Sequence, residues 1–113
     1  MLEKPRRRYI LIKIDCDGVP GERDFQNALW SGIMRLFGEY GASQTDISMI
    51  EYNRDAGYAI VRCQHKALPM VRAAIPTITK VGDKSVVLHV LLTSGTLKAL
   101  RKGVQKYLYT RCK

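Results

Sequence analysis

The order in which the hydrophobic pattern changes along the chain constrains its fold more than any other feature. Apolar residues that alternate with polar ones, many of them β-branched, predict strands, whereas apolar residues three or four positions apart predict helices. Turns rich in glycine separate most of these segments. The predicted strands lie at residues 8–15, 45–54, 58–64 and 84–92, and the predicted helices lie at residues 24–41, 66–78 and 95–110.

The first six of these elements, in the order strand, helix, strand, strand, helix, strand, match the ferredoxin-like plan. In that plan two helices cover one face of a four-stranded antiparallel sheet, and RNA-recognition domains share it. We therefore predict an α+β fold of the ferredoxin-like or RNA-recognition-like type (βαββαβ) with an additional C-terminal helix. The chain has the length of one domain, so we expect residues 1–113 to fold as a single unit.

Positive charge is concentrated at the two ends of the chain. The formal net charge is +9, to which residues 1–13 contribute +4 and residues 80–113 contribute +7, while residues 14–79 carry −2. Basic ends on a nearly neutral body indicate a polyanionic partner, although a thermophile-like surface rich in Lys and Arg is an alternative. We expect a basic N-terminal arm at residues 1–7, and we predict that Arg6, Arg7 and Arg8 bind RNA.

Residues 94–113 predict a basic C-terminal helix. Lys98, Lys102 and Lys106 are spaced four residues apart, away from the apolar stripe, and no acidic residue follows Asp83. The hydroxyls and the glycine of the preceding turn lie where free N–H groups of a helix start favour an anionic oxygen. The predicted RNA-binding residues are Ser94, Gly95, Thr96, Lys98, Arg101, Lys102 and Lys106. An ordinary solvated helix face is the alternative.

Strand alternation places four apolar residues on one face of the predicted sheet: Tyr9, Leu11, Tyr58 and Ile60. The stretch "GYAIVRC" (57–63) partly matches the signature of RNA-recognition domains, whose aromatic residues stack on bases. Few soluble monomers leave such a patch bare. We predict that the third helix covers part of this face and that the four residues form a protein interface, with base stacking as the alternative.

The stretch "IDCDGV" (14–19) is the strongest hint of catalysis. Haloacid-dehalogenase-like phosphatases begin with a strand followed by D-x-D-G, and Asp15, Asp17 and Gly18 fit that pattern. These enzymes also need a later acidic pair for Mg²⁺ and a parallel sheet, neither of which the sequence predicts. We interpret Asp15 as the end of a strand and Asp17-Gly18 as a turn. We predict no catalytic residue and no metal site in this chain.

The three cysteines form no C-x-x-C pair and are odd in number, which predicts reduced thiols and a cytoplasmic location. No apolar run approaches the roughly 20 residues of a membrane span, so we expect no membrane partner.

The chain resembles the protein component 2 family of archaeal ribonuclease P, which has relatives among eukaryotic ribonuclease P and MRP proteins. The resemblance runs from "RRRYI" (6–10) through "LFGEYGA" (36–42) and "GYAIVRC" to "TSGTLKALRK" (93–102). Its most specific part is Ser94-Gly95-Thr96 followed by a basic helix, whereas the "DCDGVPGE" turn departs from the family pattern.

The resemblance implies a subunit of the ribonucleoprotein that removes the 5′ leader of precursor tRNA. Its RNA subunit, with Mg²⁺, would be the catalyst, and the chain itself would bind no cofactor. The implied partners are ribonuclease P RNA, the TIM-barrel-like protein component 3 in a complex with two copies of each protein, and, indirectly, precursor tRNA. Two other classes remain open: a metabolite-binding ferredoxin-like regulatory module and a D-x-D metal-dependent phosphatase.

Overall fold

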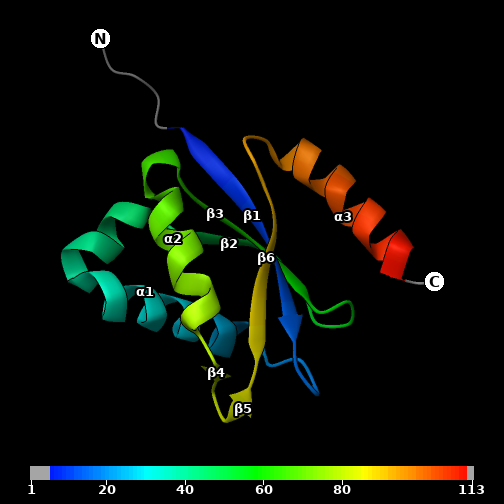
Figure 1. Cartoon of the computed structure of the whole chain (residues 1–113), viewed down its shortest axis with the longest axis horizontal. Helices are drawn as coiled ribbons and strands as arrows, with labels where there is room; N and C mark the ends of the chain where they lie inside the picture. Colours follow the sequence, from blue (N-terminus) through cyan, green and yellow to red (C-terminus); the bar gives the residue numbers. More distant parts are fainter. Residues whose placement is uncertain (1–5, 112–113) are drawn as a thin grey trace.

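A four-stranded antiparallel sheet separates helices on its two faces (Figure 1). The computed structural model describes residues 6–111, with side chains up to residue 106. The strand order β2-β3-β1-β6 is that of the ferredoxin-like plan, so the predicted fold class is confirmed. The main elements are β1 (Arg7–Asp15), α1 (Glu22–Thr45), β2 (Ser48–Asn53), β3 (Tyr58–Gln64), α2 (Leu68–Ala74), β6 (Val87–Ser94) and α3 (Leu97–Arg111).

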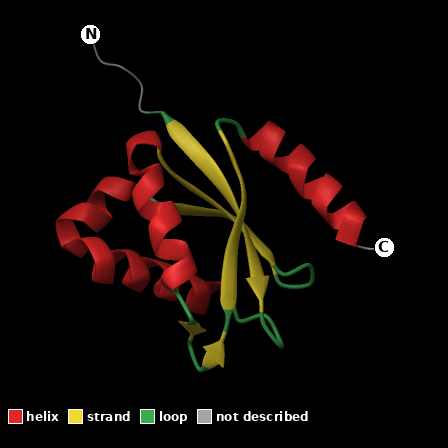
Figure 2. Ribbon diagram, viewed as in Figure 1, coloured by secondary structure: helices red, strands yellow, loops and turns green. Residues whose placement is uncertain are grey.

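Helices α1 and α2 lie side by side on one face of the sheet, which we call the helix-pair face (Figure 2). Alternate residues of β1, such as Ile10 and Ile12, point to this face and are fully buried against Phe25 of α1 and Val71 of α2. The ring of Phe25 also packs on Tyr52 of β2, with ring centroids 5.3 Å apart. This face holds the larger of the two hydrophobic cores.

Helix α3 covers the opposite face, which we call the α3 face (Figure 1). Leu100 and Val104 of α3 are buried there against Leu11, Tyr58 and Ile60. Gly103 lets the helix lie close to the sheet, since a Cβ atom at this position would overlap the side chain of Leu92. The prediction that the third helix covers part of this face of the sheet is confirmed.

Helix α1 differs from its prediction at the C-terminal end. The expected stripe ran through Leu36 and Tyr40 to a helix end at Gly41, but the helix extends to Thr45 and is interrupted at Gly38, where φ is +73°. This break redirects the chain, and the side chains of Leu36 and Tyr40 are 45% and 80% exposed. Gly38 permits the change because a residue without Cβ adopts positive φ at little cost.

The predicted strand at residues 84–92 is two strands. Lys84–Ser85 (β5) pairs with Lys80–Val81 (β4) in a small hairpin whose turn includes Gly82 at φ +60°. Only β6, which begins at Val87 and extends to Ser94, joins the main sheet. The helix predicted at residues 66–78 is also divided, because short 3-10 turns at His65–Ala67 (η1) and Ile75–Thr77 (η2) flank α2.

Candidate nucleic-acid interface

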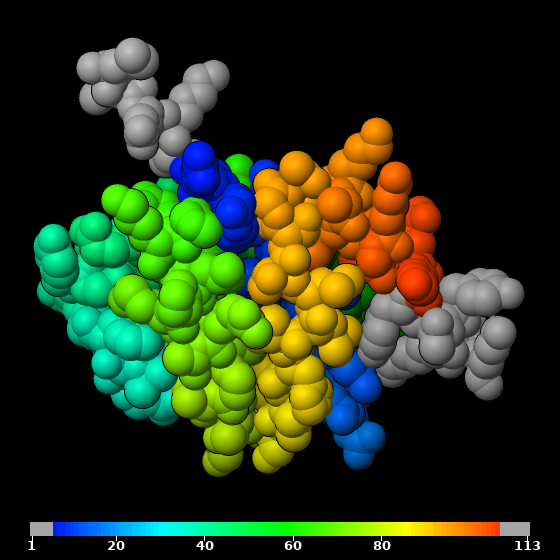
Figure 3. All heavy atoms as spheres, turned by 45° about the horizontal axis from the view of Figure 1, so that its top comes forward, coloured from blue at the N-terminus to red at the C-terminus, as the bar shows by residue number. Residues whose placement is uncertain are grey.

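The start of β1 and the turn before α3 meet at one end of the sheet, whereas residues 1–5 of the predicted basic arm lie outside the residues that the structure describes. Tyr9 of β1 pairs with Ser94 of β6, so the strand that begins with the arginines lies beside the strand that leads into α3. The Arg8 guanidinium crosses Gly95, where a Cβ atom would lie only 3.0 Å from Arg8 Nη1. The structure therefore brings Arg8 and the Ser94-Gly95-Thr96 turn together, and Figure 3 shows blue and orange atoms adjoining in this part of the molecule.

The turn caps helix α3. The Thr96 backbone N–H donates to Ser94 Oγ at 3.2 Å, and the Ala99 N–H donates to Thr96 Oγ1 at 3.2 Å. The hydroxyl oxygens thus serve as acceptors within the cap. Their O–H groups remain available as hydrogen-bond donors. The free N–H groups of the first turn of α3 are also available, because no described group accepts a hydrogen bond from them. An anionic oxygen is the natural ligand for such donors.

Lys98 and Lys102 lie on the outer side of α3. Both side chains are exposed, and neither forms an ion pair among the residues that the structure describes. They line a shallow groove along the helix with Leu97, Arg101 and Gln105. Lys106 is exposed one turn further on. The predicted lysine ladder is therefore accessible to a partner.

Two of the predicted RNA-binding arginines already have carboxylate partners. Arg101 Nη1 lies 2.8 Å from Glu51 Oε1, and Arg7 Nη1 lies 2.9 Å from Asp46 Oδ2. The other oxygen of Glu51 accepts a hydrogen bond from the Tyr58 hydroxyl, so Glu51 joins α3 to the sheet. Glu51 is a residue that sequence reasoning missed, because nothing local marks a partner fifty positions away.

The four residues predicted as a protein interface lie under or beside α3. Leu11 and Ile60 are fully buried, Tyr58 is 6% exposed, and only Tyr9 is partly accessible. With α3 in this position, neither a protein partner nor a nucleotide base reaches the first three. The role of these three residues in the structure is to hold α3 on the sheet.

Residues 8–105 match the family model described as the Rpp14/Pop5 family. The chain belongs to this family. It is 35% identical over 100 residues to "Ribonuclease P protein component 2" of Halorubrum lacusprofundi, covering 85% of this chain and 63% of the relative. It is also 31% identical over 105 residues to the same-named protein of Methanosarcina acetivorans, covering 93% of this chain and 76% of that one.

A third relative of the same name, from Methanobrevibacter smithii, is 30% identical over 112 residues and is covered over 92% of its length. Among solved structures, a chain of "Cryo-EM structure of yeast Ribonuclease MRP" superposes with a TM-score of 0.68 and 13% identity. The match covers 99% of this chain and 98% of that one, which shows a shared fold. The resemblance read from the sequence is thus confirmed at the level of the family.

The D-x-D-G stretch of this Rpp14/Pop5 chain forms a loop at the far end of β1. The side chains of Asp15 and Asp17 are exposed, and Gly18 has φ +79°. Three side chains hold the loop through its carbonyl oxygens: Lys84 Nζ donates to Gly18 O at 2.8 Å, Arg54 Nη2 to Val19 O at 3.0 Å, and the Tyr52 hydroxyl to Pro20 O at 2.6 Å. The turn interpretation fits these contacts.

The antiparallel sheet also contradicts the phosphatase alternative, which needs a parallel, doubly wound one. Residues 6–111 contain no group of three His, Cys, Asp or Glu that could hold a metal ion, and no helix there is long and apolar enough to span a membrane.

Burial raises the pKa of the Cys63 thiol to about 11, so this thiol is not a reactive nucleophile near neutral pH.

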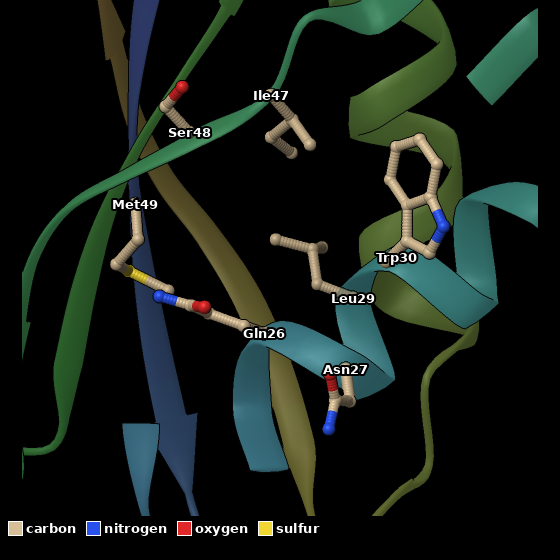
Figure 4. A pocket seen from close by; sticks show the side chains of 7 residues that line it. All are labelled: Gln26, Asn27, Leu29, Trp30, Ile47, Ser48 and Met49. Atoms are coloured by element: carbon tan, nitrogen blue, oxygen red, sulfur yellow. The ribbon is translucent and has the colours of Figure 1, made fainter. Parts of the chain in front are cut away.

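A pocket that the sequence did not suggest lies between α1 and the edge strand β2 (Figure 4). Leu29 and Trp30 of α1 face Ile47 and Met49 across it. Its remaining lining comes from Gln26, Asn27 and Ser48, so no charged side chain faces into it. The pocket offers no acid, base or metal ligand for catalysis.

Proposed function

We infer that this chain is a protein subunit of ribonuclease P that binds and stabilises the RNA subunit, which removes the 5′ leader from precursor tRNA. Membership of the Rpp14/Pop5 family, with relatives named "Ribonuclease P protein component 2", carries this proposal. The basic surface formed by Arg8, the Ser94-Gly95-Thr96 turn and the outer side of α3 supports it.

The chain contributes binding, and the chemistry of cleavage belongs to the RNA subunit and its Mg²⁺. Lys98 and Lys102 neutralise backbone phosphates, and the donors at the start of α3 hold a further phosphate oxygen. Such contacts position the RNA and carry little sequence information. The enzymatic activity, hydrolysis of a phosphodiester bond, is a property of the assembled ribonucleoprotein.

The further members of the assembly are proposals from the same family resemblance. They are protein component 3, a TIM-barrel-like subunit, in a complex with two copies of each protein, and precursor tRNA as an indirect partner. With Leu11, Tyr58 and Ile60 under α3, a protein partner has to use another surface, for which the uncharged pocket beside Trp30 is suited. We propose a cytoplasmic location for the complex.

The lysine ladder gives a direct test. Replacing Lys98, Lys102 and Lys106 with Gln keeps stem length and helix propensity, so the fold should survive. The slope of log affinity against log salt should fall by about 0.7 to 0.9 for each phosphate that is no longer neutralised, or by about two units for the triple variant. Affinity for ribonuclease P RNA is measured across a salt series, with circular dichroism to confirm folding.

The matched control replaces three exposed cations outside α3, Arg23, Lys66 and Arg72, with Gln. This variant has the same net charge as the ladder variant, so a general charge effect lowers both slopes equally. A ladder slope no lower than the control slope would mean that the lysines only face solvent. The purified chain by itself should not cleave precursor tRNA.

A metabolite-binding regulatory module is the second candidate, because the pocket between α1 and β2 could hold a small uncharged ligand. A ligand screen by thermal shift separates the two functions. A stabilising metabolite together with no measurable RNA affinity would favour the regulatory module over the ribonuclease P subunit.

A further inference from the structure

A second groove lined by cations lies on the helix-pair face, remote from α3. It runs between α1 and the segment that connects η2 to β4. Helix α1 contributes Ser31 and Arg35, the connecting segment contributes Thr79, and the start of β4 contributes Lys80. The rest of the lining comes from Ala28, Gly32 and Ile78. Neither the sequence pattern nor the family resemblance marked this groove.

A glycine brings its two walls together. A Cβ atom on Gly32 would lie 2.8 Å from Ile78 Cγ1, closer than packed side chains approach, so only glycine lets α1 sit this near to the connecting segment. Ser31 and Arg35 are one helical turn apart and therefore project from the same side of α1. Pairing of Lys80 with Ser85 and a hydrogen bond from Val86 N to Thr79 O at 3.0 Å fix the other wall.

The polar groups in this groove lack partners within the described residues. Arg35 and Lys80 are exposed and form no ion pair there, and the hydroxyls of Ser31 and Thr79 form no hydrogen bond. Glu39 follows Arg35 by four residues, but the break at Gly38 ends the helical spacing that would pair them. No acidic residue occurs between positions 56 and 82. Two cationic residues and two hydroxyl-bearing residues thus line one open groove.

The setting of these cations differs from that of the other basic residues near the sheet ends. Arg7 and Arg101 are paired with carboxylates, and Arg54 and Lys84 donate to loop carbonyls. Those side chains are committed to holding the fold. Arg35 and Lys80 have no such role among the described residues. A site with positive charge and hydroxyl donors favours an anionic oxygen ligand.

We propose that this groove binds a backbone phosphate of RNA, at a second site separate from the α3 ladder. The proposal rests on the proposed function, because it takes ribonuclease P RNA as the polyanion. Since α1, which forms one wall of the groove, and α3 lie on opposite faces of the sheet (Figure 1), the two sites engage different segments of the RNA. The chain then bridges two RNA segments across its sheet.

The test replaces Arg35 and Lys80 together with Gln and measures affinity for ribonuclease P RNA across a salt series. The matched control replaces Arg23 and Arg72, two exposed cations of α1 and α2 that do not line the groove, with Gln. The salt slope of the groove variant should be lower than that of the control by about 0.7 to 0.9 for each phosphate released. Arg35→Lys with Lys80→Arg, which keeps both charges, should retain most of the slope.

Footprinting of the same RNA adds a positional readout. The groove variant should no longer protect nucleotides that stay protected with the α3 ladder variant. A groove slope equal to that of its control, or the same unprotected nucleotides in both variants, would overturn the second site. Wild-type protein that shows no salt-dependent RNA binding would instead contradict the proposed function, whereas a slope lowered only by the ladder variant would leave that function intact.

Discussion

The two faces of the sheet are held by cores of different construction. On the helix-pair face, side chains from α1, α2, η2 and the central strands interlock, so the core draws on most of the chain. On the α3 face a single helix contributes Leu100 and Val104 to a small cluster, aided by the link from Arg101 through Glu51 to Tyr58. We therefore expect the helix-pair face to control global unfolding of the domain and the α3 face to open locally.

The largest effect is expected from Phe25→Ala on the helix-pair face. Phe25 is fully buried and packs against Tyr52, so truncation leaves a cavity and should lower the free energy of unfolding by about 3 to 5 kcal/mol. Urea denaturation measures this value. Gln26→Ala, at the exposed neighbouring position, should change it by less than about 0.5 kcal/mol.

Leu100→Ala should have a smaller and more local effect. Leu100 is 1% exposed, and its truncation should destabilise the docking of α3 by about 2 kcal/mol, at the low end for a Leu truncation because the cluster is small. Hydrogen exchange should accelerate at the α3 amides while amides of β1 and β3 keep their protection. Equal acceleration in all three elements would show that the two faces unfold together.

Alkaline pH should weaken both faces through one tyrosine on each. Burial raises the pKa of Tyr52 to about 12 against the opposing charge of Arg54, and burial with the Glu51 hydrogen bond raises the pKa of Tyr58. A raised pKa favours the neutral phenol in the folded state. Its contribution to stability is therefore complete below pH 10 and is lost as the pH rises through the folded-state pKa.

Phenylalanine variants separate the two contributions. Tyr52→Phe should reduce the loss of global stability between pH 10 and about 12, whereas Tyr58→Phe should reduce the loosening of α3 above pH 10. Chemical denaturation reports the first effect and exchange at α3 amides the second. If Tyr58→Phe altered global stability in the same way as Tyr52→Phe, the α3 face would not be an independent unit.

The smallest effect is expected at the end of β1, beyond both cores. Asp15 and Asp17 are exposed, and the loop that contains them is held through backbone carbonyls rather than through these carboxylates. Asp15→Asn or Asp17→Asn should leave precursor-tRNA cleavage by a reconstituted holoenzyme within a few-fold of wild type. A hundred-fold loss in a folded Asp15→Asn variant would indicate a metal site.

Local patterns were sufficient to predict the two faces of the central strands, because alternation in β1 and β3 assigns each residue to a face. Ile10 and Ile12 point to the helix-pair face, and Leu11 and Ile60 to the α3 face, as their spacing requires. The break in α1 could not be predicted in the same way. The sequence predicted a helix end at Gly41, whereas Gly38 is the residue that adopts positive φ and the helix continues to Thr45.

The candidate site was predictable only in part, for a related reason. The lysine spacing of α3 is a local signal, and the structure leaves Lys98 and Lys102 accessible. The pairing of Arg101 with Glu51 and the meeting of Arg35 with Lys80 join positions far apart in sequence. Such pairings depend on how elements pack, and a single sequence carries no signal for them.

The position of β1 between β3 and β6 has a consequence for how the chain folds. In chain order β1 comes first among the strands of the sheet, yet it is a central strand, and its neighbours β3 and β6 are synthesised later, β6 just before α3. Pairing of Tyr9 with Ser94 closes a loop that spans most of the domain, and such remote pairings slow folding relative to a helical bundle. Arg8 and Gly95 meet only after that closure, so a partly synthesised chain does not yet possess the basic surface that the finished protein presents.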